Sequence, residues 1–284
     1  MLTHQELLHG ILIPVVISAL IACIGAWRRW PFTMPLAAGV AFIVAYATAA
    51  GIPKFPPHDG SDWLFWLAIP LTLIAVGDSV VGAAVMAGAH PTWAARYGWV
   101  LGASASAVAA VLLNPLADVE SHVRWVTVAV FAIAGTALAL VASVAQRRLG
   151  SGWTLAAFCI AIGGAGVVIL SSDSRTIGLH GIAAAAALGP VFVLGARLRA
   201  AQSVALLAAP LLAGLLLAGH FYAGVTCTNM SVLLAAPMLL LIGAFLPIKQ
   251  QWQRGVIALI AVTICSEVSQ NRLARTSSAR CGLP

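Results

Sequence analysis

The chain has 284 residues, of which 61% are hydrophobic and only 8% are charged. A soluble globular domain carries about 25% charged residues, so this composition excludes one and indicates an integral membrane protein. The formal net charge of +7 does not indicate nucleic-acid binding, because most basic residues lie in short linkers between apolar segments, where membrane topology explains them.

Hydropathy divides the chain into about ten apolar segments joined by short linkers. A hydrocarbon core about 30 Å thick needs about 20 residues of helix, which rises 1.5 Å per residue. The sequence therefore predicts an all-α integral membrane protein, a polytopic bundle of about ten transmembrane helices without a soluble domain. This single domain covers residues 1–268, and a polar, basic tail follows at 269–284. The predicted spans are 7–27, 34–52, 63–87, 97–115, 125–145, 153–171, 179–196, 201–219, 230–248 and 254–268.

Tryptophan placement supports these boundaries independently of hydropathy. Indole rings prefer the headgroup level of a bilayer, where one edge of the ring is wet and the rest is buried. All nine tryptophans of the chain lie close to a predicted span end: Trp27, Trp30, Trp63, Trp66, Trp93, Trp99, Trp125, Trp153 and Trp252.

Basic residues predict the orientation of the bundle. Linkers after the odd-numbered spans carry Arg28, Arg29, Arg96, Arg147, Arg148, Arg197, Arg199, Lys249 and Arg254, whereas the opposite linkers carry only Lys54, Arg124 and Arg175. Short loops rich in Lys and Arg stay on the cytoplasmic side. The amino terminus is therefore expected to face outward, into the periplasm if the chain lies in a bacterial inner membrane.

The last segment leaves an alternative open. It has only about fourteen apolar residues before Glu267, a length that also suits a re-entrant or interfacial piece. If it does not cross, nine spans remain and the tail becomes cytoplasmic with its basic residues, Arg272, Arg275 and Arg280. We prefer ten spans, because a charge bias at the end of a chain is weaker evidence. An outward tail would also allow Cys227 and Cys281 to form a disulfide.

With this orientation, nearly all acidic and histidine side chains are expected on the outer face. These residues are Glu6, Asp59, Asp62, Asp118, Glu120, Asp173, Glu267, His4, His9, His58, His122, His180 and His220. The densest outer-face cluster combines residues 54–63, with His58, Asp59 and Asp62, and residues 118–122, with Asp118, Glu120 and His122.

This cluster has two interpretations. Imidazole and carboxylate groups attract cations and bind divalent metals, so it predicts a vestibule or a metal site of unknown identity. However, no zinc-type spacing is present. Turn and capping chemistry also explains the same residues, with Asp59 and Gly60 in a turn and Ser61 or Asp62 capping the next helix. We prefer this second interpretation.

Asp78 is the one carboxylate expected inside a span. It lies about fifteen residues into the third span, about 22 Å below the outer end, and Ser79 follows it. A buried carboxylate costs a few kcal/mol and commonly serves function. The sequence predicts a proton or cation relay here, or an anchor for a substrate amine. The alternative is a structural role, in which Asp78 caps a turn or pairs with Arg96.

A second candidate site is the uncharged connection 218–231 between the eighth and ninth predicted spans. This connection holds His220, Tyr222 and Asn229 within a stretch of ten residues. Such groups can bind a ligand or line a re-entrant turn. The alternative is an ordinary loop with interfacial aromatic rings, in which Asn229 or Thr228 caps the following helix.

No enzyme motif is present, and no cofactor is expected. The chain has no nucleophile elbow, no His-Glu-x-x-His, no P-loop and no dinucleotide-binding fingerprint. Two hypotheses remain. The first is a transporter of a small solute or ion, with Asp78 as the coupling group and the lipid bilayer as its surroundings. The second is a non-catalytic subunit that packs against other membrane-protein subunits.

Overall fold

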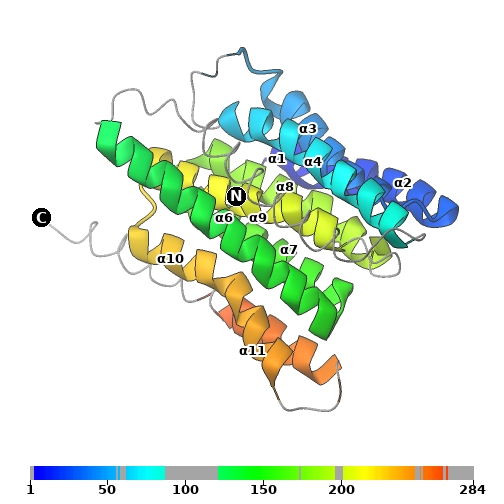
Figure 1. Cartoon of the computed structure of the whole chain (residues 1–284). Helices are drawn as coiled ribbons and strands as arrows, with labels where there is room; N and C mark the ends of the chain where they lie inside the picture. The colour runs from blue at the N-terminus through cyan, green and yellow to red at the C-terminus, as the bar shows by residue number, and fades with distance from the viewer. Residues whose placement is uncertain are drawn as a thin grey trace, which may run out of the picture.

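A computed structural model describes residues 3–55, 57, 62–86, 121–172, 174–195, 201–246, 250, 252–264 and 267. All regular structure in these residues is helical, as the sequence predicts (Figure 1). The helices are α1 (His4–Leu7), a π-helical turn (Leu8–Leu12), α2 (Ile13–Arg28), α3 (Thr33–Ala50), α4 (Asp62–Met86), α6 (Ser121–Leu149), α7 (Ser151–Leu170), α8 (Arg175–Gly195), α9 (Ala201–Ala223), α10 (Cys227–Ala235), a 3₁₀ turn (Ala236–Met238) and α11 (Leu239–Phe245).

Seven helical stretches of the described residues are long and apolar enough to cross a membrane, which is compatible with a multi-pass membrane protein. They are His4–Arg28, Thr33–Ala50, Asp62–Val81, Gly152–Leu170, Arg175–Leu194, Ser203–Ala223 and Cys227–Phe245. The predicted span 125–145 lies within α6, and the predicted span 97–115 lies outside the described residues. The last predicted span, 254–268, corresponds to a shorter apolar helix, Trp252–Ile264. The choice between ten and nine spans therefore stays a prediction.

Short turns make consecutive helices run antiparallel. Only Gly150 separates α6 from α7, and it adopts φ 96°, a conformation that glycine tolerates without a Cβ clash. Arg29 ends α2 with φ 57°, in the left-handed region that commonly terminates helices. Helices that such short turns join and that pack against each other, as α2 and α3 or α6 and α7 do, form antiparallel pairs.

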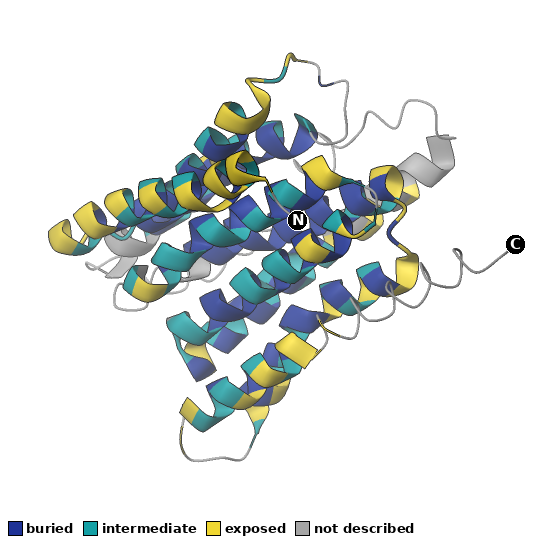
Figure 2. Ribbon diagram, turned by 180° about the vertical axis from the view of Figure 1, so that it is seen from behind, coloured by how far each residue is buried: buried dark blue, intermediate teal, exposed yellow. Residues whose placement is uncertain are grey.

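Helix α9 forms the centre of the bundle. It packs against α3, α4, α6, α7, α8 and α10, and 83% of the residues in its apolar window are buried, against 22% for the window in His4–Arg28. Figure 2 shows the same difference, because buried residues dominate the central helices and exposed ones occur on the outer helices. Any polar group on the inward faces of α9 is therefore surrounded by protein.

Glycines bring α7 and α8 into backbone contact. A Cβ atom added at Gly166 would lie 2.8 Å from the Ile182 nitrogen and 2.9 Å from the Gly178 oxygen. At Gly163 the nearest atom is the Ala185 Cβ, at 3.4 Å. Small residues permit such approach in membranes, where dispersion contacts hold helices together. The backbones of α7 and α8 therefore approach each other closely at Gly166.

Candidate functional site

Asp78 and Ser203 form a polar contact between α4 and α9. The Ser203 hydroxyl donates a hydrogen bond to the Asp78 carboxylate, with 2.6 Å between Oγ and Oδ2. Asp78 is half-buried and Ser203 is buried. Asp78 lies sixteen residues after the start of α4, about 24 Å along the helix, so the contact is close to the face where α4 ends. The predicted pairing of Asp78 with Arg96 is not tested, because Arg96 lies outside the described residues.

Two opposing effects act on the Asp78 charge. Ser203 lies in the first turn of α9, where the helix dipole and the free N–H groups favour a negative charge. The apolar surroundings favour the neutral acid. No Lys or Arg side chain of the described residues forms an ion pair with Asp78. Among the described residues, the balance between these two effects therefore determines the charge of Asp78.

Ser79, the neighbouring candidate, is buried with only 5% of its surface exposed. Its hydroxyl has no hydrogen-bond partner among the described residues. Buried hydroxyl groups without a partner are uncommon, because they lose their hydrogen bonds to water. Ser79 therefore adds an unsatisfied polar atom to the chain segment that carries Asp78.

A second polar contact joins α3, α4 and α8 at the opposite face. The Tyr46 hydroxyl donates to the Asp62 carboxylate at 2.7 Å, and the Tyr46 ring stacks on the His180 ring with centroids 4.1 Å apart. His180 is 4% exposed, and its Nδ1 has no hydrogen-bond partner among the described residues. Nearby along the same face, Arg175 forms an ion pair with Glu6, with 2.5 Å between Nε and Oε1.

The predicted outer-face cluster is described only in part. The Asp62 carboxylate accepts a hydrogen bond from Tyr46, and Asp62 is the first residue of α4. The described part of the chain does not include His58, Asp59, Asp118 and Glu120. The backbone of His122 lies in α6, but its side chain is not in the described part. Within the part of the chain that the structure describes, no three His, Cys, Asp or Glu side chains gather closely enough to hold a metal ion.

His220 lies in the last turn of α9 rather than in a loop. Its Nδ1 is 2.7 Å from the Val225 carbonyl oxygen, and its Nε2 is 3.8 Å from the Cys227 sulfur. Tyr222 is exposed and Asn229 is buried. Neither Asn229 nor Thr228, the two capping residues that the sequence suggests, caps α10. Thr226 does so instead, because its hydroxyl accepts a hydrogen bond from the Asn229 backbone nitrogen at 3.3 Å.

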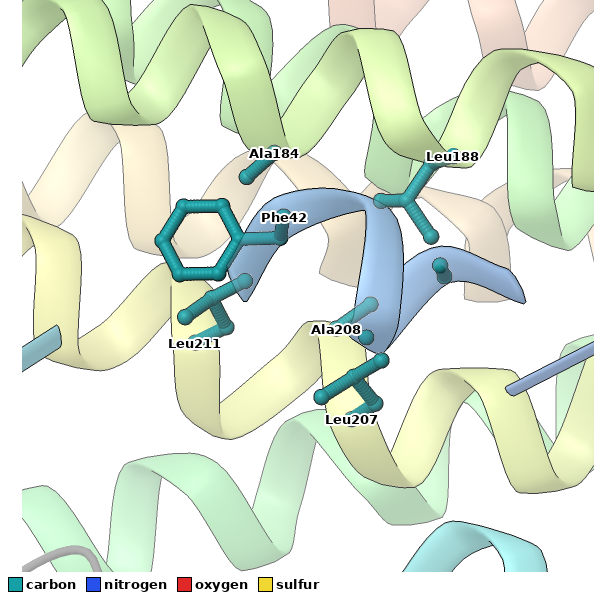
Figure 3. A pocket seen from close by; sticks show the side chains of 8 residues that line it. Phe42, Ala184, Leu188, Leu207, Ala208 and Leu211 are labelled. Atoms are coloured by element: carbon teal, nitrogen blue, oxygen red, sulfur yellow. The ribbon is translucent and has the colours of Figure 1, made fainter. Parts of the chain in front are cut away.

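The structure separates Asp78 from His220. Asp78 contacts Ser203, and the seventeen residues from Ser203 to His220 span about 26 Å of helix. Asp78 does not line either of two cavities that described residues form. The smaller, of about 10 Å³, lies among α3, α8 and α9 and is lined by apolar side chains such as Phe42 and Leu211 (Figure 3). It is about the size of one water molecule and has no polar partner for one.

Sequence reasoning missed two of the partners that define these contacts. Ser203 is one serine in a segment rich in Leu and Ala, and Tyr46 follows a run of apolar residues in α3. Neither residue belongs to a motif, and their roles depend on which helices pack together. A polar residue in an apolar span was the one signal available for both.

Comparison of the chain with protein-family models, curated proteins and solved structures found no match.

Proposed function

We propose that this protein transports a small solute or ion across a membrane, with Asp78 as the coupling group. The observation that carries the proposal is the hydrogen bond between Asp78 and Ser203 at the first turn of α9. Ionisable residues within membrane segments commonly mark ion or substrate pathways. A carboxyl group without a basic partner among the described residues can bind a proton, a metal cation or an amine and change its charge.

Breaks in the helices support movement around this site. Pro70 lies inside α4 and Pro210 inside α9, and each proline removes one backbone hydrogen bond and bends its helix. The apolar stretch Cys227–Phe245 is interrupted by the 3₁₀ turn at Ala236–Met238. Discontinuous helices are common in transporters, where they supply both hinges and ligand groups.

The proposed setting is a bacterial inner membrane with a periplasmic amino terminus. The basic linkers predict this orientation. Asp78 then lies in the cytoplasmic half, and Tyr46, Asp62, His180 and His220 lie near the periplasmic face. Transport would require a conformational change that connects the two faces, because the cavity in Figure 3 is too small and too apolar for a polar solute.

The experiment uses the purified chain in vesicles that contain a pH-sensitive dye. A panel of small amines, carboxylates, amino acids and inorganic cations is added outside, and proton movement that follows each addition is recorded. A transporter coupled through Asp78 moves protons with at least one compound, and the Asp78→Asn variant does not. If the wild-type protein moves no proton with any compound, or if the variant matches it, proton coupling through Asp78 is wrong.

A second candidate is a structural subunit of a larger membrane complex. The close backbone contact at Gly166 and the dry, apolar centre among α3, α8 and α9 favour this candidate. Here Asp78 and Ser203 serve to join α4 and α9. Purification in mild detergent would then recover other membrane proteins in fixed ratio with the chain, and Asp78→Asn would leave that ratio unchanged.

A further inference from the structure

Cys227, at the start of α10, contacts His220, in the last turn of α9. The Val225 carbonyl oxygen lies 2.7 Å from His220 Nδ1, and a carbonyl oxygen can only accept. Nδ1 must therefore carry the proton, which leaves a lone pair on Nε2 of the neutral ring. The Cys227 thiol, 3.8 Å from Nε2, is placed to donate its proton to that lone pair.

The position of Cys227 also favours a reactive thiol. Cys227 is the first residue of α10, directly after the Thr226 cap, and its side chain is free and exposed. The site thus combines a nucleophile, a base and a backbone carbonyl that orients the base, an arrangement typical of covalent catalysis.

An apolar groove lies beside His220. It lies among α6, α9 and α10, has a volume of about 200 Å³, and has His220 as its one ionisable lining residue. An apolar cavity of about 150 Å³ already binds benzene. Val126 and Val130 line one wall and are exposed, so the groove opens sideways toward the surface that faces lipid. From His220 to Ala213, also a lining residue, it extends about 10 Å along α9.

We propose that Cys227 accepts an acyl group from an acyl thioester, with the hydrocarbon chain held in this groove. The thiol proton moves to His220 Nε2, and the sulfur attacks the acyl carbonyl carbon. A new carbon–sulfur bond forms at Cys227 while the carbon–sulfur bond to the leaving group breaks. The proton passes from Nε2 to the leaving thiolate. The products are a Cys227 thioester and a free thiol, and no atom is oxidised or reduced.

This proposal is independent of the transport proposal, because Asp78 contacts Ser203 in the first turn of α9, whereas His220 lies in the last turn of that helix. Loss of acyl transfer would leave the Asp78 site untouched, and failure of transport would leave the groove and the thiol unchanged.

The experiment uses the full chain in phospholipid vesicles with two probes, the decanoyl and acetyl thioesters of N-acetylcysteamine. Mass spectrometry of peptides measures acylation at Cys227 and at Cys23, an exposed cysteine of α2. We expect decanoyl transfer to Cys227 to exceed transfer to Cys23 and to be reversed by hydroxylamine. The His220→Asn variant keeps a donor for Val225 but lacks the base, so transfer should fall about a hundredfold.

Two further variants test the contributions of the groove and of the thiol separately. Val130→Trp fills the groove from its exposed wall and should slow decanoyl transfer about tenfold more than it slows acetyl transfer. Moving the thiol by one residue, in the double variant Cys227→Ser and Thr228→Cys, should abolish rapid transfer. Equal rates at Cys227 and Cys23 in the wild-type chain would overturn the proposal without any variant, as would an unchanged rate in His220→Asn.

Discussion

The Ser203 hydroxyl donates a 2.6 Å hydrogen bond to the Asp78 carboxylate and so links α4 to the first turn of α9. This bond predicts an asymmetry between substitutions at its two ends. Ser203→Ala leaves a half-buried carboxyl group without its donor and should lower the free energy of unfolding by about 1–3 kcal/mol. Asp78→Asn keeps an acceptor for the hydroxyl and should change it by less than about 1 kcal/mol.

Denaturant unfolding of both variants in detergent would measure this difference. The double variant, Asp78→Asn with Ser203→Ala, closes the cycle and isolates the energy of the pair. Equal losses of stability in the two single variants would mean that Ser203 does not stabilise the Asp78 carboxylate.

Close packing of α7 on α8 predicts a second asymmetry, between two glycines. Alanine at Gly166 would meet backbone atoms of α8 within 3 Å, whereas nothing lies within 4 Å of the Cβ position at Gly189. Gly166→Ala should therefore lower the free energy of unfolding by about 1–3 kcal/mol. Gly189→Ala should raise it slightly, because alanine favours helix over glycine by about 1 kcal/mol.

Thermal unfolding of the two glycine variants side by side provides the measurement. Both changes add one methyl group to a helix, so differences in helix propensity largely cancel. A Gly166→Ala protein as stable as Gly189→Ala would contradict the backbone contact between α7 and α8.

The Tyr46 hydroxyl is expected to stabilise the junction of α3 and α4. Tyr46→Phe keeps the ring stacked on His180 but removes the donor to Asp62, so the free energy of unfolding should fall by about 1 kcal/mol. Asp62→Asn keeps an acceptor oxygen and serves as the control. The prediction fails if chemical denaturation gives the same midpoint for Tyr46→Phe and the wild-type chain.

The orientation is tested by labelling single cysteines in intact cells with a membrane-impermeant maleimide. In a chain whose native cysteines are replaced by serine, His4→Cys should react from outside and Gln250→Cys should react only after permeabilisation, as the basic linkers predict. A cysteine at Ser277, in the tail, reacts from outside with ten spans and not with nine. The reverse pattern at His4 and Gln250 would refute the predicted orientation.

Helix positions followed from the sequence better than side-chain partners did. The predicted span 34–52 corresponds to the helix Thr33–Ala50, because apolar length and turn residues are local properties.

Partners across helices could not be predicted in the same way. Ser203 reaches Asp78 across 125 residues of sequence, and Tyr46 reaches His180 across 134. Which helices become neighbours depends on packing of the whole bundle, and the hydropathy of a single span carries little information about it. The cap of α10 shows the same limit at short range, because Thr226, Thr228 and Asn229 are all suitable capping residues and only the backbone geometry selects Thr226.

The central claim is that Asp78 couples transport, and the most direct test is proton movement into dye-loaded vesicles after addition of a transported compound. The account predicts that the wild-type chain moves protons, that Asp78→Asn does not although it remains as stable, and that Asp62→Asn retains most of the wild-type rate. Equal proton movement by the wild-type and Asp78→Asn proteins would contradict the claim.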